Sequence, residues 1–310
     1  MTRTLLLVGT RKGAFILDGG PDRTGWSLSE PLCEGWPIHD LQWDDTTGSI
    51  YAGGGSSWYG PAVFRSDDGG KTWTHLHGLR DHPSRQDPGW SPGAGGLICH
   101  TIVPHPTDAD RMWIAISAVG TFETTDGGQT WEPRNKGVRA DFNPGPEPVT
   151  GQCVHKLVRA AGEPETLYQQ NHCGVYRSFD GGLTWDEIDT GLSSEFGFVM
   201  ATHPRDAETA WVIPLSHPEE GRVVPGGALA AWRTRDRGDT WERQANGLPQ
   251  ENAYVGVLRE ALSADRGDPA GVYFGTSTGQ LYGSTDEGAS WQRIADNLPA
   301  IWGVQAIEVD

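Results

Sequence analysis

The chain has 310 residues, about twice the usual length of one domain, so either two domains or one large repetitive domain is expected. Its 43 glycines and 21 prolines exclude an all-α fold, because an interior Gly costs a helix about 1 kcal/mol and a Pro about 3 kcal/mol, whereas fourteen tryptophans favour short strands with aromatic anchors. The net charge of −17, with no run of Lys or Arg to offset it, argues against nucleic acid or a membrane surface as a partner.

The N-terminal segment predicts strands over residues 5–10, 13–18 and 25–29, joined by a turn at 18–24. Its longest apolar run, Leu5 to Val8, is too short for a signal peptide, and no stretch approaches the ~20 apolar residues of a membrane span. The four cysteines form no C-x-x-C pair, so we expect free, buried thiols in a cytoplasmic protein.

One octapeptide, S/T-x-D-x-G-x-T/S-W, then recurs five times at intervals of 50 to 58 residues. The copies begin at Ser66, Thr124, Ser178, Thr234 and Ser284. The Asp carboxylate can accept backbone N–H groups across a tight turn, Gly supplies a positive φ, and Trp can bury its ring between sheets. Each copy therefore predicts a turn between two strands.

Each repeat carries four predicted strands, and four strands per ~50 residues are typical of one propeller blade. One strand precedes the octapeptide and another begins at its Trp. The further strands expected in the repeats lie at 49–52, 111–116, 166–169, 209–213 and 271–275, and those directly before the octapeptide include 62–65, 174–177 and 279–283. The N-terminal blade lacks its innermost strand, and the spare strand at 302–309 can supply it. We therefore predict one all-β domain over residues 1–310, a six-bladed β-propeller whose ring the C-terminal strand closes in the N-terminal blade.

The octapeptide resembles the Asp box, or bacterial neuraminidase repeat. The whole chain resembles Asp-box propellers, which include sialidases, sortilin-type domains, oligoxyloglucan-type glycosidases and photosystem II assembly-factor-like proteins. It looks closest to small bacterial sialidase-like, glycosyl-hydrolase-type repeat proteins. This resemblance implies that the boxes lie away from the active site, so that the box carboxylates are turn residues: Asp68, Asp126, Asp180, Asp236 and Asp286.

Four histidines are predicted to meet at one end of the propeller. His39, His100 and His155 each precede the aromatic residue of the next strand by 12 or 13 residues, and His172 lies in a loop expected on the same face. Three imidazoles with an open position are typical of a catalytic metal site for Zn, Fe, Cu or Ni. Alternatively, His100 or His155 acts as a general acid or base beside a carboxylate, or the repeated His merely forms hydrogen bonds between blades. The candidate carboxylates are Asp40, Asp87, Asp141 and Glu195.

Two unusually long connections, at residues 74–96 and 132–152, border the same blades. From them we expect substrate contacts by Arg85, Trp90 and Arg139, and a catalytic role for Asp87. Another loop follows the glycines at 53–55; it is either a plain turn between two strands or, through Trp58, an aromatic surface for a sugar or an aromatic ligand.

The remaining histidines predict no site. His105, His203 and His217 lie in His-Pro pairs and are expected in turns, whereas His75 and His77 are expected to face solvent.

The resemblance to sialidases is incomplete at the site. Sialidases carry an Arg-Ile-Pro motif, three arginines for the substrate carboxylate, and a Tyr–Glu pair. This chain has no Arg-Ile-Pro, and position assigns only Arg11 and Arg259 to substrate binding and Tyr254 to the catalytic tyrosine. Cleavage of sialic acid is therefore not expected.

These patterns predict a hydrolase or lyase that acts on a small polar or sugar-like molecule at a His-rich channel mouth, with or without a metal. The alternative is a non-catalytic propeller that binds a protein or a glycan. The sequence does not determine the oligomeric state.

Overall fold

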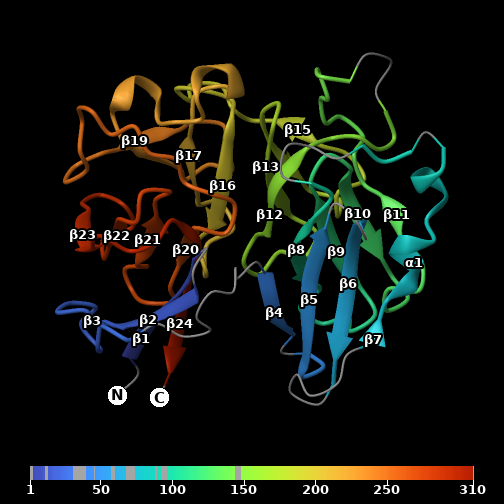
Figure 1. The fold of residues 1–310 in the computed structure, drawn as a ribbon, viewed down its shortest axis with the longest axis horizontal. Helices are drawn as coiled ribbons and strands as arrows, with labels where there is room; N and C mark the ends of the chain where they lie inside the picture. Colours follow the sequence, from blue (N-terminus) through green and yellow to red (C-terminus); the bar gives the residue numbers. More distant parts are fainter. Residues whose placement is uncertain are drawn as a thin grey trace. The chain divides into compact units, whose positions relative to one another are not determined.

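The computed structural model describes residues 3–10, 13–30, 40–44, 46–56, 60–67, 74–87, 89–91, 96–143 and 148–309. Strands dominate these residues, and their only α-helix is the single turn α1 (His77–Arg80), which is followed by the short 3₁₀ helix η1 (Pro83–Arg85) (Figure 1). Two further 3₁₀ turns lie at η2 (Pro218–Glu220) and η3 (Pro225–Gly227). None of the helices described is long and apolar enough to cross a lipid bilayer.

The chain divides into two compact units. Unit 1 comprises Met1–His39, Ala160–Gly162 and Asp189–Asp310, and unit 2 comprises Asp40–Arg159 and Glu163–Ile188. The described residues form six four-stranded antiparallel sheets, three in each unit. Four-stranded sheets at every repeat confirm the all-β, blade-like architecture, whereas a closed ring of six blades stays a prediction.

The sheets of unit 1 consist of β1 (Arg3–Thr10), β2 (Gly13–Asp18), β3 (Ser27–Leu28) and β24 (Ile301–Val309); β16 (Gly197–Thr202), β17 (Ala210–Pro214), β18 (Ala231–Thr234) and β19 (Glu242–Gln244); and β20 (Leu262–Ala264), β21 (Val272–Gly275), β22 (Leu281–Ser284) and β23 (Gln292–Ala295). The sheets of unit 2 consist of β4 (Asp40–Asp44), β5 (Ser49–Ser56), β6 (Gly60–Ser66) and β7 (Thr74–His75); β8 (Cys99–Pro104), β9 (Met112–Ile116), β10 (Gly120–Thr124) and β11 (Glu132–Pro133); and β12 (Val154–Arg159), β13 (Leu167–Asn171), β14 (Val175–Ser178) and β15 (Asp186–Glu187).

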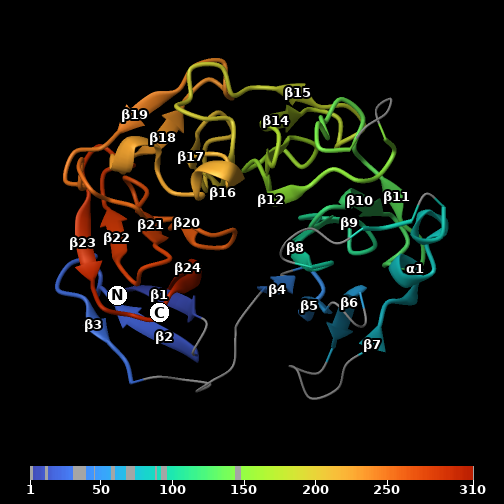
Figure 2. The ribbon, with the colours of Figure 1, turned by 45° about the horizontal axis from the view of Figure 1, so that its top comes forward.

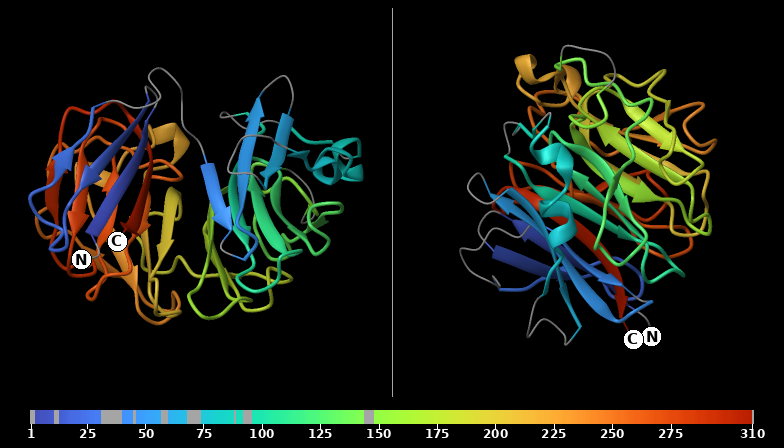
Figure 3. Two further views of the ribbon diagram at one scale, coloured as in Figure 1. Left: turned by 90° about the horizontal axis from the view of Figure 1, so that it is seen from below. Right: turned by 90° about the vertical axis from the view of Figure 1, so that its right-hand side faces the viewer.

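The C-terminal strand completes the N-terminal sheet, as predicted. β24 pairs antiparallel with β1 over nearly its whole length, with Leu6 opposite Ala306 and Val8 opposite Val304. The blue β1 and the red β24 lie side by side in Figure 2 and in both views of Figure 3. The inner edge of β1 is therefore paired with the other end of the chain.

Alternating side chains of the strands in unit 2 pack adjacent blades together. On β9, Ile114 belongs to a buried cluster with Tyr51 of β5, whereas its neighbour Trp113 belongs to another cluster with Tyr176 of β14. Successive residues of a strand point to opposite faces, so one strand supplies apolar side chains to two blade interfaces. This period explains why the strands of the blade interior, such as β9, are buried at every position.

The Asp boxes form the predicted turns. In the copy that begins at Thr124, one oxygen of Asp126 accepts the backbone N–H groups of Gln129 and Thr130 at 2.9 and 2.8 Å, while the other oxygen accepts the Thr130 hydroxyl at 2.6 Å. The Thr124 hydroxyl donates to Asp126 and accepts the N–H of Gly128. Equivalent bonds hold the copies that begin at Ser178, Thr234 and Ser284, whereas most of the first copy lies outside the described residues.

The strand after each described box begins one residue later than predicted, because the Trp still belongs to the turn. The indole of Trp131 is buried and its Nε1–H donates to Gly128 at 3.2 Å. The first of the two turn positions also takes a positive φ without glycine, at Arg237 (63°) and Glu287 (58°). The bonds to the carboxylate therefore hold this turn even where a Cβ opposes it.

Candidate functional site

Two of the predicted histidines occupy equivalent β-bulges of unit 2. The pairing of β8 with β9 shifts between Cys99 and Thr101, which places His100 in the irregularity. The pairing of β12 with β13 shifts between Val154 and Lys156, which places His155 in the same position of the next blade. A bulge adds a residue on one strand and redirects a side chain, which is how both imidazoles leave the regular alternation of their strands.

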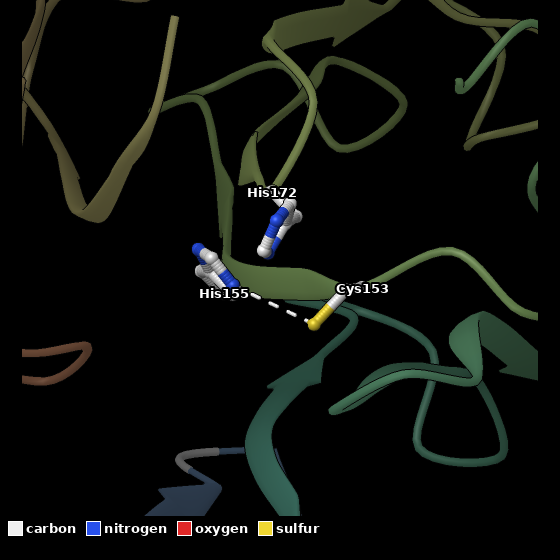
Figure 4. A group of neighbouring side chains, drawn as sticks. All are labelled: Cys153, His155 and His172. Atoms are coloured by element: carbon white, nitrogen blue, oxygen red, sulfur yellow. Dashed lines mark hydrogen bonds between the residues drawn. The ribbon is translucent and has the colours of Figure 1, made fainter. Parts of the chain in front are cut away.

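A compact cluster at the start of β12 comprises Cys153, His155 and His172, and Figure 4 shows their side chains directed toward one another. One potential ligand atom from each residue lies within 4.8 Å of the other two. The thiol of Cys153 and Nε2 of His155 are 3.5 Å apart, and the rings of His155 and His172 are 5.6 Å apart between centroids. Cys153 and His155 are buried, whereas His172 is half-buried.

The β13–β14 hairpin places His172 over the start of β12. The backbone N–H of His172 donates to the carbonyl of Cys153 at 2.9 Å, so the hairpin tip is fixed to the strand that carries the other two residues. Gly174 adopts a φ of +100° at the tip, and the N–H of Cys173 donates to the side-chain oxygen of Asn171. The local turn, and not only the distant packing, therefore orients His172.

His100 supports the cluster from the neighbouring blade. Its Nε2 lies 2.9 Å from the carbonyl of Val154, the residue between Cys153 and His155. A carbonyl can only accept, so Nε2 carries the proton, and Nδ1 accepts from the Thr101 hydroxyl at 2.9 Å. Both ring nitrogens are thus engaged in positioning the strand, and His100 is not a member of the three-residue cluster.

Unpaired amide atoms flank the cluster on both strands. The side-chain oxygen of Gln152, which precedes Cys153, is buried without a hydrogen-bond partner among the described residues, and so is Nδ2 of Asn171, which precedes His172. Neither side-chain atom of the fully buried Gln169 has a partner in this part of the chain. Buried amides that lack protein partners are usually satisfied by water or by a polar ligand.

An exposed aromatic ring borders the cluster. Phe142, in the long connection after β11, is 49 % exposed, and its ring meets that of His172 edge-on at 5.1 Å. Phe142 therefore presents an apolar ring to solvent directly beside the polar cluster.

The residues predicted in the first long loop lie apart from the cluster, and one of them lines a cavity of unit 2. Asp87 lines a cavity of about 1030 Å³ together with His82, Ser84 and Trp131, and none of the cluster residues lines it. Trp90 donates to the hydroxyl of Ser84 at 2.8 Å, and the Arg85 guanidinium lies 5.7 Å from the Trp90 ring. The structure therefore brings these residues together with one another but not with His155.

Arg139 is held by two carboxylates. Its guanidinium binds Glu187 at 2.6 Å and Asp141 at 2.7 Å, so its charge is already neutralised on the protein surface. Burial raises the pKa of Tyr176, whose hydroxyl contacts the backbone N–H of Arg139 at 3.3 Å and which therefore stays a neutral phenol. These contacts fix the second long loop against the β12–β15 blade.

Two predicted residues belong to unit 1, and three fall outside the described residues. Tyr254 is 64 % exposed, and the guanidinium of Arg259 lies 5.2 Å from the ring of Phe198. Arg11, His39 and Trp58 are not among the residues whose structure or side chains are described.

The turn histidines are confirmed, with one correction for the pair expected in solvent. Nδ1 of His105 accepts the N–H of Asp108 at 3.0 Å, and Nδ1 of His203 accepts that of Arg205 at 3.1 Å. His77 is exposed as expected, but the prediction for His75 is wrong. His75 is half-buried and its Nε2 is shut off from solvent, because its ring packs 4.9 Å from Phe64.

Sequence reasoning missed Cys153. Among the described cysteines, Cys99, Cys153 and Cys173 are free and buried, as predicted, but only Cys153 joins the histidine cluster. The available signal was the Cys-x-His spacing of Cys153 and His155, which puts two metal-ligating residue types at the start of one strand.

Comparison with known proteins gives the repeats and the fold. A sequence profile of the BNR/Asp-box repeat matches residues 64–75 and 122–133. A probable oligoxyloglucan-reducing end-specific xyloglucanase of Neosartorya fischeri is 22 % identical over the whole chain and 38 % of its own length, and a xyloglucanase of Paenibacillus sp. is 24 % identical over 65 % of the chain and 21 % of its length. The chain thus spans less than two fifths of these relatives.

Solved structures show a similar fold. An ancestral GH74 enzyme aligns with 94 % of the chain and 37 % of its own, at a TM-score of 0.57 and 16 % identity. YCF48 bound to D1 peptide aligns with 93 % of the chain and 76 % of its own, at a TM-score of 0.50 and 17 % identity. The chain is therefore built from BNR/Asp-box repeats in a propeller-type fold, and the curated relatives named here are xyloglucanases rather than sialidases.

Proposed function

We propose that the protein is a hydrolase or lyase that acts on a small polar, sugar-like molecule at the cluster of Cys153, His155 and His172. The observation that carries the proposal is the meeting of two imidazoles and a thiol at one end of a blade, bordered by an exposed aromatic ring. The likeness to xyloglucanases supports a sugar-like substrate.

The residues divide the work between binding and activation. Phe142 offers an apolar face to the C–H groups of a sugar ring. His172, half-buried between Phe142 and His155, is the imidazole within reach of such a ligand.

The cluster favours activation of water over the usual glycosidase mechanism. Most glycosidases place two carboxyl groups on either side of the scissile bond, whereas the three-residue cluster contains none. In hydrolysis an imidazole would accept a proton from water, or a metal held by the cluster would lower the pKa of that water. The water oxygen would then attack the substrate carbon while the leaving oxygen is protonated. In a lyase the same base would remove a C–H proton as the leaving group departs.

The test is turnover of a panel of small oligosaccharides, including fragments of xyloglucan, followed by chromatography of the products. We expect cleavage by the wild type and at least a ~100-fold loss in His172→Ala, in line with the typical contribution of one acid or base. His217→Ala removes a histidine from a turn of unit 1 and serves as the matched control, with unchanged activity expected.

Phe142→Ala separates binding from chemistry, because it should raise KM without lowering kcat. If the wild type binds sugars or peptides but converts none of them, the proposal fails and the alternative of a non-catalytic binding propeller stands.

A further inference from the structure

We propose that Cys153, His155 and His172 together bind one divalent transition-metal ion, with Zn²⁺ as the preferred occupant. The inference rests on the proposed function only for the ion's role, since the ion would be the activator of water at that site. The assignment differs from the sequence-based metal site in its ligands, because Cys153 enters the set and His100 leaves it.

The separation of the donor atoms fits a tetrahedral ion. A Zn–S bond of ~2.3 Å and a Zn–N bond of ~2.0 Å at the tetrahedral angle place sulfur and nitrogen about 3.6 Å apart. Sγ of Cys153 and Nε2 of His155 lie 3.5 Å apart, so these two ligands need no rearrangement. The remaining donor separations are at most 4.8 Å and need closure by no more than about 1.5 Å, which a rotation of the half-buried His172 side chain can supply.

The chemistry of the donor set selects the ion. Thiolate and imidazole together are ligands of Zn²⁺ and of the other late transition metals, whereas Mg²⁺ and Ca²⁺ take oxygen ligands. Binding replaces the thiol proton of Cys153, which passes to solvent as the S–metal bond forms, and neither sulfur nor metal changes oxidation state. Three protein ligands leave one position of a tetrahedral ion for water or substrate, as in catalytic zinc sites.

The surrounding hydrogen bonds hold the ligands in register. The His100 side chain binds the carbonyl of Val154 between two of the ligands, and the carbonyl of Cys153 accepts the backbone N–H of His172. The hydroxyl of Ser117 lies 3.9 Å from the Cys153 sulfur. His100 is therefore a positioning residue, and its loss should weaken metal binding 10- to 100-fold, roughly the cost of removing an outer-shell partner.

The experiment is a titration of the full-length, chelator-stripped protein with Co²⁺, followed by absorption spectroscopy. Thiolate coordination to Co²⁺ gives a near-ultraviolet charge-transfer band, and four-coordinate Co²⁺ gives intense visible bands. We expect both to saturate at about one equivalent and to disappear on addition of Zn²⁺. Cys153→Ser should abolish the charge-transfer band, and His155→Ala and His172→Ala should weaken Co²⁺ binding at least ~100-fold.

Cys99→Ala is the matched control, because Cys99 is a buried, free thiol of the preceding blade that lies outside the cluster, so its loss should leave the band unchanged. Circular dichroism checks the fold of each variant, and a rise in the wild-type melting temperature with Zn²⁺ gives a readout that needs no variant.

The outcomes separate the ion from the activity. No charge-transfer band in the wild type, or a band that survives in Cys153→Ser, overturns the metal site. Turnover of an oligosaccharide that is insensitive to chelator and to Cys153→Ser overturns the role of the ion as activator of water but leaves the proposed function in place. One tightly bound ion without turnover of any sugar supports the metal site and refutes the proposed function.

Discussion

Removal of the Asp180 carboxylate should destabilise unit 2 without disturbing the candidate site. Asp180 accepts three hydrogen bonds: from the Ser178 hydroxyl at 2.7 Å, the Thr184 N–H at 2.9 Å and the Thr184 hydroxyl at 2.6 Å. It lies at the β14–β15 turn, whereas His172 lies at the β13–β14 turn, so the two residues occupy opposite ends of β14.

The expected magnitude follows from these bonds. At about 0.5–1.5 kcal/mol for each, Asp180→Ala would lose roughly 1.5–4.5 kcal/mol, and the partial exposure of the turn favours a value near 2 kcal/mol. Asp180→Asn keeps one side-chain oxygen, which can still accept from Ser178 and from the Thr184 N–H, so it should cost about 1 kcal/mol.

Urea unfolding followed by tryptophan fluorescence measures these free energies. Asp186→Ala, which removes an exposed carboxylate from the neighbouring strand β15, should stay within ~0.5 kcal/mol of the wild type. A cost below ~0.5 kcal/mol for Asp180→Ala would refute the assignment of the box carboxylate as a structural residue. A loss of Co²⁺ binding at normal stability would refute its separation from the site.

Two other predictions concern the Asp-box carboxylates and a glycine of the second long connection. Burial opposes ionisation of Asp126 and Asp180, but the hydrogen bonds from Thr130 and Thr184 outweigh it and lower the pKa of each carboxyl group. The unfolded value is about 3.9, and a lower pKa in the folded state stabilises the fold above that pH. This stability is lost as the pH falls from about 3.9 through the folded-state pKa. The urea concentration at the unfolding midpoint should therefore decrease when the pH is lowered below about 4, and it should decrease less in Asp180→Asn. Gly137→Ala should cost more than about 2 kcal/mol in thermal or urea unfolding, because Gly137 has a φ of +93° and a Cβ would lie 2.5 Å from the Trp185 carbonyl oxygen. Gly191→Ala, at a φ of +94° with open space around it, should cost only about 1 kcal/mol, and equal costs would exclude the steric contribution.

The blades were predictable because their information is local. A carboxylate, a glycine and a tryptophan within eight residues specify a turn, and period-two alternation on both sides specifies the strands, so β9, β17 and β21 match their predicted ranges to within a residue at either end. The pairing of β24 with β1 was also predictable, because one blade lacked a strand and the chain had one to spare.

The site was only partly predictable. The residue spacing placed His100 and His155 at equivalent positions, and the two do occupy equivalent bulges of neighbouring blades. Counting could not tell that one imidazole donates to Val154 while the other meets a thiol, because the direction of a side chain in a bulge depends on the neighbouring blade.

The repeat, the four-stranded sheets and the structural role of the Asp boxes thus follow from the sequence alone, since each depends on residues a few positions apart. The packed fold was needed to show that Cys153 joins His155 and His172, that Asp87 lines a separate cavity and that Trp90 contacts Ser84. Those groupings join loops and strands far apart in the chain, and their geometry follows from packing between blades that no local pattern encodes.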